Sequence, residues 1–310
     1  MALIATAQDF RNLDTLIGDG MIPYRNLPTG TRKSEADLQA LANTYFPNDP
    51  HGYHYALVIY DWTSADFVRF NLFTQMAYTS IAGDPLDVAS MQQLVWAAYH
   101  TAEYSAENAD FMNMFGLPAA DSLDDVINLL TPDFVHALAP LVLSECRIFA
   151  DAVLKLPDIP VASYPNLFRG AMPMSVRPGL SITDRFGAQM LEFSGNAGPL
   201  DVPLSISLPQ ARQELFYDGA TITPKTCWSF SDSEAGAKVW QQGIIVAVEP
   251  PSATDYWPGG ADITPFSLNP GTVEFNFPMR TRYQIKGTHW FPINDVPVLV
   301  LNAVMLGRDD

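Results

Sequence analysis

The sequence predicts an α+β fold, with a helical N-terminal half packed with a mixed, mainly antiparallel β core. Apolar residues recur at helical spacing from Ser34 to about residue 156. After Pro157 the chain changes to short β-branched and aromatic runs separated by turn residues. Helices followed by strands, rather than alternating with them, are typical of an α+β domain.

The composition indicates a folded chain with an acidic surface. Of the 310 residues, 48% are hydrophobic and 16% are charged, and the formal net charge is −17. Nucleic-acid binding depends on Lys and Arg that neutralise phosphates, so this charge argues against a nucleic-acid partner. A protein or small-molecule target is expected instead. The carboxylates between residues 34 and 168 are interpreted as a solvated face. The oligomeric state stays open.

The cysteines and the N-terminus bear on where the protein is made. Cys146 and Cys227 are the two cysteines, and each is expected to be a buried thiol rather than part of a disulfide framework. The N-terminus lacks a basic segment followed by an apolar one, and no apolar run is long enough to span a membrane. We therefore expect synthesis in the cytoplasm without a signal peptide. Delivery into a host or target cell as a secreted effector stays open.

The helical half begins after an interrupted segment. Residues 1–50 are expected to form an N-terminal extension or cap, because glycines and prolines interrupt residues 1–33. Ser34 and Asp37 can cap a helix with Leu38 and Ala42 on one face. Helical spacing continues over three stretches, residues 91–104, 121–130 and 133–155. Breaks or first turns are expected at three prolines, Pro118, Pro132 and Pro140.

The second half is expected to consist of short strands. They are predicted at residues 161–169, 202–208, 223–230, 243–248, 271–277, 281–285 and 296–306. One helix is expected between them, over residues 232–240. Residues 256–270 are rich in Pro and Gly and are expected to form a loop.

Three segments place a functional group at the edge of an expected strand. The first, residues 166–170, ends in Arg169-Gly170; the guanidinium offers a fixed fork of donors that suits phosphate, and glycine lets a ligand approach the backbone. The second, residues 226–231, reads Thr-Cys-Trp-Ser-Phe-Ser, and alternation directs Phe230 into the core. In the third, residues 271–285, Glu274 opens an apolar strand that turns at Pro278 and returns.

Taken in order, these segments resemble the mono-ADP-ribosyltransferases of the Arg-Ser-Glu class, which include bacterial toxins and effectors. Residues 60–67 with Asn71 are also similar to a helix entry of that family, in which Thr63 or Ser64 would cap a helix. The resemblance covers residues 55–306. It implies one domain over residues 51–310, with a helical part at 51–157 and a β-rich catalytic core of ADP-ribosyltransferase type at 158–310.

The resemblance implies cleavage of NAD⁺ at its nicotinamide bond and transfer of ADP-ribose to a macromolecule. Glu274 would be the catalytic carboxylate, Ser229 would hold it, and Arg169 would hold the dinucleotide. Further NAD-binding residues would be Gly170, Trp228 and Ser231. NAD is then a co-substrate, and no metal is expected. The histidines show no ligand spacing and are interpreted as structural: His51, His54, His100, His136 and His289.

The chain departs from the family two residues before the catalytic glutamate. Members that modify arginine carry a glutamate there and members that modify asparagine a glutamine, whereas this chain has Thr272. A hydroxyl cannot act as a general base toward a guanidinium, so arginine is disfavoured as the acceptor. Thr272 and Phe266, from the expected loop, are assigned to substrate recognition. Two alternatives stay open: an NAD glycohydrolase, and a catalytically silent interaction protein with this fold.

Overall fold

The chain folds into helices and mixed sheets that form two compact units. The computed structural model describes residues 4–24, 31–66, 69–70, 72–74, 87–99, 111–170, 191–195, 198–199, 208–224, 226–240, 243–268 and 271–308. The first unit consists of the described parts of Met1–Ala77, Leu86–Leu156 and Ile263–Gly271. The second consists of the described parts of Pro157–Asp262 and Thr272–Asp310. The α+β class predicted from the sequence is confirmed.

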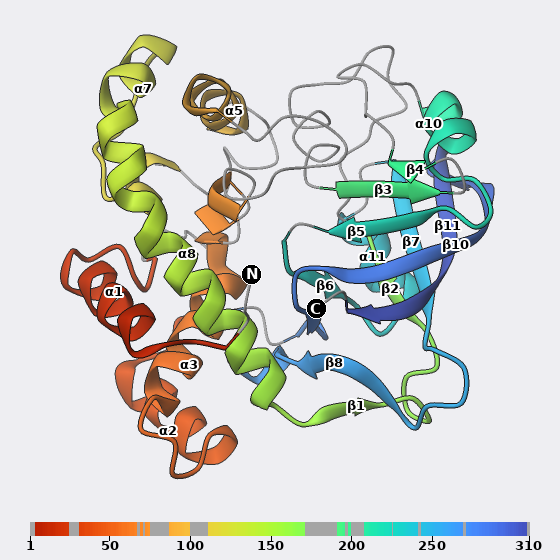
Figure 1. Cartoon of the computed structure of the whole chain (residues 1–310), viewed down its shortest axis with the longest axis horizontal. Helices are drawn as coiled ribbons and strands as arrows, with labels where there is room; N and C mark the ends of the chain where they lie inside the picture. Colours follow the sequence, from red (N-terminus) through yellow and green to blue (C-terminus); the bar gives the residue numbers. More distant parts are fainter. Residues whose placement is uncertain are drawn as a thin grey trace. The chain divides into compact units, whose positions relative to one another are not determined.

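The first unit is helical. Its α-helices are α1 (Ala7–Gly18), α2 (Glu35–Tyr45), α3 (Gly52–Asp61), α5 (Val88–Tyr99), α7 (Leu123–Leu129) and α8 (Pro132–Lys155). Shorter turns are η1 (Trp62–Asp66), η2 (Phe111–Phe115) and η3 (Thr264–Phe266). Helices α1 and α3 pack against α8, the longest of the described helices (Figure 1).

Helix boundaries follow the capping residues. The helix expected after Ser34 is confirmed as α2, because the Ser34 hydroxyl accepts from the Asp37 amide and the Asp37 carboxylate accepts from the Ser34 amide. Helices expected at residues 121–130 and 133–155 are confirmed as α7 and α8. The break expected at Pro140 is wrong, because α8 continues through it. The Thr63 and Ser64 hydroxyls donate to the Tyr60 and Asp61 carbonyls at the end of α3, and Ser64 lies at a kink in η1. Residues 67 and 68, on which the expected cap depends, lie outside the described part.

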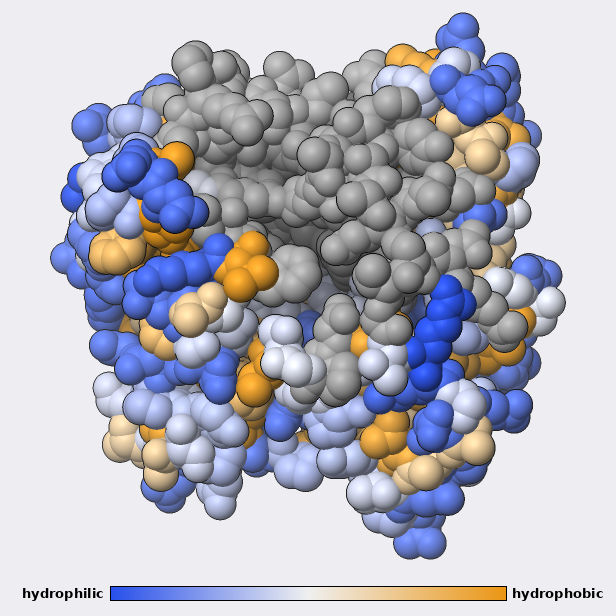
Figure 2. Space-filling model, turned by 180° about the vertical axis from the view of Figure 1, so that it is seen from behind, coloured by the Kyte–Doolittle hydropathy of each residue, from blue (hydrophilic) through white to orange (hydrophobic). Residues whose placement is uncertain are grey.

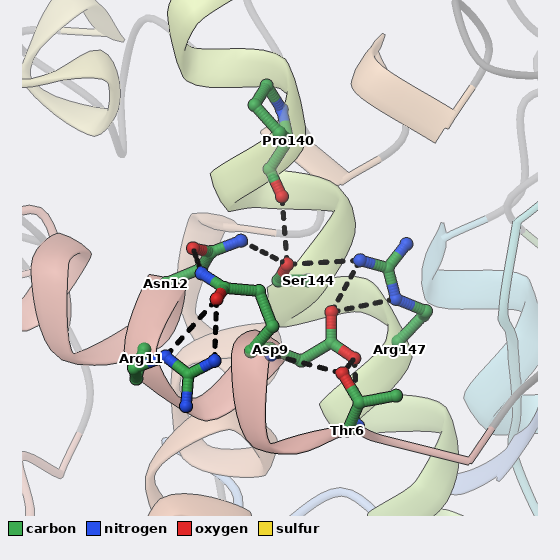
Figure 3. A network of polar contacts seen from close by, with 8 residues as sticks. Thr6, Asp9, Arg11, Asn12, Pro140, Ser144 and Arg147 are labelled. Atoms are coloured by element: carbon green, nitrogen blue, oxygen red, sulfur yellow. Dashed lines mark hydrogen bonds and ion pairs between the residues drawn. The ribbon is translucent and has the colours of Figure 1, made fainter.

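Helix α1 lies where the sequence was read as irregular. Thr6 and Asp9 form a reciprocal capping box, the same signal that marks α2, and the prolines and glycines lie beyond the end of this helix. The Asp9 carboxylate also accepts from Nε of Arg147 on α8 at 2.9 Å (Figure 3). Ser144 accepts from Asn12 at 2.8 Å and from Arg147 at 3.0 Å. This network fixes α1 on α8 through charged and polar contacts.

The second unit contains two sheets. A seven-stranded sheet has the order β2-β7-β11-β10-β5-β3-β4, and a four-stranded sheet has the order β1-β8-β9-β6 (Figure 1). The strands are β1 (Asp158–Pro160), β2 (Leu167–Arg169), β3 (Leu191–Gly195), β4 (Gly198–Pro199), β5 (Thr221–Pro224), β6 (Trp228–Phe230), β7 (Ile244–Glu249), β8 (Tyr256–Asp262), β9 (Phe275–Phe277), β10 (Thr281–Ile293) and β11 (Val296–Arg308). Two helices accompany them, α10 (Leu208–Glu214) and α11 (Glu234–Trp240). All pairings between these strands are antiparallel except β7 with β11.

Several expected strands are confirmed, whereas others are shorter or divided. The strands expected at 243–248, 281–285 and 296–306 and the helix at 232–240 are confirmed. Of residues 161–169 only Leu167–Arg169 form a strand, because the amides of Ser163 and Tyr164 both bond the Pro160 carbonyl in a turn. Residues 223–230 divide between β5 and β6, in different sheets. Residues 202–207 lie outside the described part, and Leu208 begins a helix.

The loop expected at residues 256–270 is wrong for its first half, which forms β8. Asp158 pairs with Ala261 while the next residue, Ile159, pairs with Trp257, so Pro258 to Gly260 form a bulge in the ladder. A proline at a bulge need not donate a ladder hydrogen bond, which explains how Pro258 is tolerated inside a strand.

The aromatic core of the second unit holds its four-stranded sheet against neighbouring strands. Phe277 contacts Phe230 edge-on, with 5.4 Å between ring centroids, and Trp228 stacks with Tyr283 at 5.3 Å. All four side chains are buried. Trp228 and Phe230 lie on β6, whereas Phe277 lies on β9, so this cluster fixes the alignment of those two strands.

The described surface is mostly polar. Figure 2 shows one face on which hydrophilic residues predominate and hydrophobic ones are scattered. Asp121 and Asp124 are exposed, which agrees with the solvated face expected from the sequence. In the described part of the chain, no single helix is long and apolar enough to cross a membrane; α7 and α8 pass that test only as a pair, with a 68° bend between them.

The fit of Gly260 against Phe277 gives a stability prediction. A Cβ at Gly260 would lie 2.1 Å from Cε1 of Phe277, whose ring is enclosed by the core. Gly260→Ala should therefore lower the free energy of unfolding by about 1–3 kcal/mol, measured by urea denaturation. Gly287→Ala in β10 is the control, because nothing lies within 4 Å of a Cβ there. Equal losses in the two variants would contradict the steric explanation.

The Asp9 network predicts an acid-dependent loss of stability. Burial opposes ionisation of Asp9, but hydrogen bonds from Arg147 and Thr6 outweigh it and lower its pKa from 3.8 to about 2. A folded-state pKa below the unfolded value of about 3.9 means that this stabilisation is present above that pH and is lost as the pH falls toward about 2. Asp9→Asn should cost roughly 1–2 kcal/mol at neutral pH.

Equilibrium unfolding of the wild type and Asp9→Asn across this range measures the effect. The difference between them should shrink as the pH falls. Asp14→Asn is the control on the same helix, because Asp14 is exposed and its contact is with His54. A difference for Asp9→Asn that is independent of pH would show that the ionic network does not hold α1.

Candidate active site

The first expected motif lies where the two sheets of the second unit meet. Phe168 of β2 forms an antiparallel bridge with Ser231, just after β6: its amide bonds the Ser231 carbonyl at 3.0 Å, and the Ser231 amide bonds its carbonyl at 2.7 Å. Arg169 follows Phe168, and its Nη1 donates to the Ser229 carbonyl at 2.8 Å. Backbone pairing thus brings the Arg169 side chain to the second motif.

The second and third motifs meet through side chains. Strands β6 and β9 pair antiparallel, with Ser229 opposite Asn276. Glu274 lies two residues before Asn276, so strand alternation directs both toward the face that carries Ser229. The Ser229 hydroxyl donates to Oε1 of Glu274 at 2.5 Å. Arg169, Ser229 and Glu274 therefore form a continuous chain of contacts.

Asn276 is a site residue that the sequence analysis missed. Its side-chain nitrogen donates to the Ser229 hydroxyl at 3.0 Å, and the residue is fully buried. The available signal was alternation: Phe275 and Phe277 face the aromatic core, so the residue between them must face the side of Glu274. Ser229 thus contacts the side chain of Asn276 in β9 and that of Glu274, directly before this strand.

Trp228 lies beneath Arg169 instead of presenting a free ring. The Arg169 guanidinium carbon lies over the Trp228 ring, 4.9 Å from its centroid, and the same ring stacks with Tyr283. Trp228 is 3% exposed, so the NAD contact expected for its ring finds no open surface in this structure. The ring supports Arg169. Burial raises the pKa of Tyr283 well above its usual range, which keeps this hydroxyl neutral beside the guanidinium.

The other expected NAD-binding residues lie next to this chain of contacts. Gly170 is buried directly after Arg169, and Ser231 is buried in the bridge to Phe168. Helix α11 is capped by Ser233, whose hydroxyl accepts from the Gly236 amide at 3.2 Å, and not by Ser231. Phe230 is buried in the core, as alternation predicted.

The two residues assigned to target recognition differ in environment. Thr272 is half-buried, two residues before Glu274. Phe266 is fully buried in η3, with its ring centroid 5.1 Å from that of Tyr45 in the first unit. The Phe266 side chain therefore offers no surface to a target in this structure, and its recognition role stays a prediction. Its neighbour Leu268 is held by the Thr63 hydroxyl, which accepts from the Leu268 amide at 3.0 Å.

Among the described residues, the cysteines and the possible metal ligands have the following environments. Cys146 and Cys227 are buried thiols, as expected, and burial raises the pKa of Cys227 to about 12, so it is a poor nucleophile. His51 stacks on Phe10 with 3.5 Å between centroids, which is a packing role. Across the described residues, His, Cys, Asp and Glu form no group of three that could hold a metal ion. His100 lies outside the described part.

Comparisons with known proteins find similarity at a low level and only among solved structures. No family model matches the sequence, and no curated protein does. Among solved structures, the ADP-ribosyltransferase HopU1 of Pseudomonas syringae pv. tomato is 12% identical over 98% of this chain and 99% of its own, with a TM-score of 0.39. The Salmonella SpvB ATR domain is 13% identical over 79% of this chain and all of its own, with a TM-score of 0.36.

A third similar structure was determined with ligands. Exoenzyme S of Pseudomonas aeruginosa, in complex with human 14-3-3 protein beta and bound to Carba-NAD, is 12% identical over 87% of this chain and 89% of its own, with a TM-score of 0.32. Bacterial ADP-ribosyltransferase toxins and effectors are thus what this chain is similar to in solved structures. Scores this low do not establish a shared activity, so function has to be argued from the side chains of the site.

Proposed function

We propose that the chain is a mono-ADP-ribosyltransferase that cleaves NAD⁺ and transfers ADP-ribose to a protein acceptor. One observation carries this proposal: Arg169, Ser229 and Glu274, which the motifs assign to one site, form a continuous chain of contacts although 60 and 45 residues separate the bonded pairs. Three residues assigned to such roles by chance would rarely form both the Arg169–Ser229 and the Ser229–Glu274 contact.

The side chains of Glu274 and Ser229 suit cleavage of the N-glycosidic bond of NAD⁺. Departure of nicotinamide takes the electron pair of the N-glycosidic bond and leaves an oxocarbenium-like ribose. A carboxylate near that ribose stabilises the positive charge as it develops, and Glu274 supplies it. The bond from Ser229 restricts the Glu274 rotamer before substrate arrives. The new bond then forms between the ribose carbon and the acceptor, whose proton is released.

Arg169 suits the rest of the dinucleotide. A guanidinium has five donors, and the contacts to the Ser229 carbonyl and the Trp228 ring hold it in place. Its planar fork of donors and its positive charge suit phosphate. Gly170, directly after it, has no side chain, although it is buried in this structure. These residues therefore fit NAD.

The acceptor and delivery are proposed from charge and from resemblance. A net charge of −17 disfavours nucleic acid, so we place the acceptor among proteins, with delivery into a host cell as a secreted effector. Thr272 offers no general base for an arginine acceptor, and this favours NAD⁺ hydrolysis as the second candidate activity.

Incubation with NAD⁺ labelled in the adenylate and in the nicotinamide, with and without a host-cell lysate, separates the candidates. A transferase labels a macromolecule and releases nicotinamide faster when lysate is present. A glycohydrolase releases nicotinamide at the same rate in both and labels nothing. Absence of release in both conditions would identify a silent protein and overturn the proposal.

Removal of the Glu274 charge should affect the transition state more than the ground state. Glu274→Gln keeps the size of the side chain and should lower nicotinamide release on the order of 100- to 1000-fold, with little change in NAD⁺ affinity. Release kinetics and calorimetric binding measure the two effects. Glu249→Gln, at the exposed end of β7, is the matched control and should retain full activity. Near wild-type turnover of Glu274→Gln would remove Glu274 from the mechanism.

Arg169→Ala should weaken binding as well as turnover, because the guanidinium contacts the ground state. Loss of a charge-assisted contact of about 1.5–3 kcal/mol corresponds to roughly 10- to 100-fold weaker NAD⁺ binding in calorimetry. Arg212→Ala is the control: Arg212 also donates to a backbone carbonyl, that of Thr288, but contributes nothing to the site. Unchanged NAD⁺ affinity in Arg169→Ala would show that another group holds the phosphates.

A further inference from the structure

We propose that Asn276 is a positioning residue, which fixes the Ser229 hydroxyl so that its proton is directed to Glu274. The inference rests on the proposed function, because Glu274 is taken as the group that acts on NAD⁺. Asn276 itself has no assigned role in the three motifs, and its side chain contacts Ser229 rather than Glu274.

The position of Asn276 is unusual for a polar side chain. It lies in β9, the inner strand between β8 and β6, with Ala261 on one side and Ser229 on the other. It is fully buried, and Oδ1 has no hydrogen-bond partner among the residues that the structure describes. A buried amide with one unsatisfied oxygen costs stability relative to an apolar residue of similar size. Packing alone therefore does not account for an asparagine here.

The direction of the hydrogen bonds at Ser229 assigns a role to Asn276. An amide nitrogen only donates, so Nδ2 uses one acceptor site of the Ser229 oxygen. The single proton of that hydroxyl is then directed to Oε1 of Glu274. The result is a chain of two donors in series that ends on a carboxylate, in which each bond polarises the next.

The reverse orientation of the Asn276 amide is disfavoured, because the Ser229 hydroxyl has one proton to donate. It would place Oδ1 against the Ser229 oxygen, and then Asn276 and Glu274 would compete for one proton. Whichever acceptor received that proton, the other would lose its bond from Ser229. Glu274 therefore requires the nitrogen of Asn276, and not its oxygen, to face Ser229.

Asn276→Leu separates positioning from packing. It removes the donor and the unsatisfied oxygen while keeping the branched arrangement of side-chain heavy atoms, so the melting temperature should stay the same or rise. Nicotinamide release should nevertheless fall roughly 10- to 100-fold, with KM for NAD⁺ little changed, because a misdirected catalytic group lowers kcat. A structural role predicts the opposite: a lower melting temperature with full activity per folded molecule.

Two controls test whether Asn276→Leu lowers turnover through Ser229. Thr281→Val removes another buried hydrogen bond, from Thr281 to the Pro278 carbonyl in the turn between β9 and β10, and should lower stability without lowering turnover. In a Ser229→Ala background, Asn276→Leu should cause no further loss of turnover, since its effect runs through Ser229. Additive losses in this double-mutant cycle would overturn the proposal.

Asn276→Asp gives a signature in the pH profile. An ionised carboxylate at this position accepts rather than donates and competes with Glu274 for the Ser229 proton, whereas a protonated carboxyl donates again. Turnover of Asn276→Asp should therefore rise relative to the wild type as the pH is lowered. A constant ratio of the two rates across pH would contradict the donor role.

A measurement without turnover separates this inference from the proposed function. The side-chain amide signals of Asn276, identified in nitrogen-15 spectra by their loss in Asn276→Leu, should shift in Glu274→Gln and should not respond to that change in a Ser229→Ala background. Asn276 amide signals that do not shift in Glu274→Gln would overturn the positioning role. An inactive wild type that still shows the relayed shift would contradict the proposed activity and leave the Asn276 contact standing.

Discussion

The candidate site depends on Ser229, which is bonded through both its backbone and its side chain. Its carbonyl accepts from Arg169, and its hydroxyl joins Glu274 and Asn276. Side chains alternate along a strand, so a shift of β6 by one residue would exchange Ser229 for an aromatic neighbour and break every one of these side-chain contacts. The register of β6 against β9 is therefore the constraint from which the site follows.

That register is fixed by the apolar face of the same strands. Trp228 and Phe230 bracket Ser229 on β6, and Phe275 and Phe277 bracket Asn276 on β9, so any slip would expose two buried aromatic rings. Burial of such rings is among the largest contributions that a side chain makes to stability. The hydrophobic core thus sets the positions of the polar groups on the opposite face, and those groups need contribute nothing to folding.

This division between an apolar face that fixes the register and a polar face that carries the site explains how much could be predicted from the sequence. Capping residues and alternation are local signals, so they located α2, α8, β7, the start of β10 and most of β11, and they separated Phe230 from Ser229. Neighbours across a sheet are not local: Asn276 contacts a residue 47 positions away, and Pro258 fits in β8 only because a bulge relieves its missing donor. Helix α1 carried a usable signal in Thr6 and Asp9, which the glycines and prolines after it outweighed.

The segment that precedes Glu274 shows how burial limits what can contact a target. Between β8 and β9 the chain runs through the helical unit, where Phe266 is buried and the backbone of Leu268 bonds both Thr31 and Thr63. Such anchoring holds the segment in place and withdraws its large apolar side chains from the surface. Among the described residues that follow, Thr272 and Val273 are half-buried and adjoin Glu274 directly. Under the proposed function, an acceptor that approached the carboxylate along this segment would meet a hydroxyl and a branched apolar side chain, neither of which can take up a proton. The acceptor group would then have to be nucleophilic without help from these two residues.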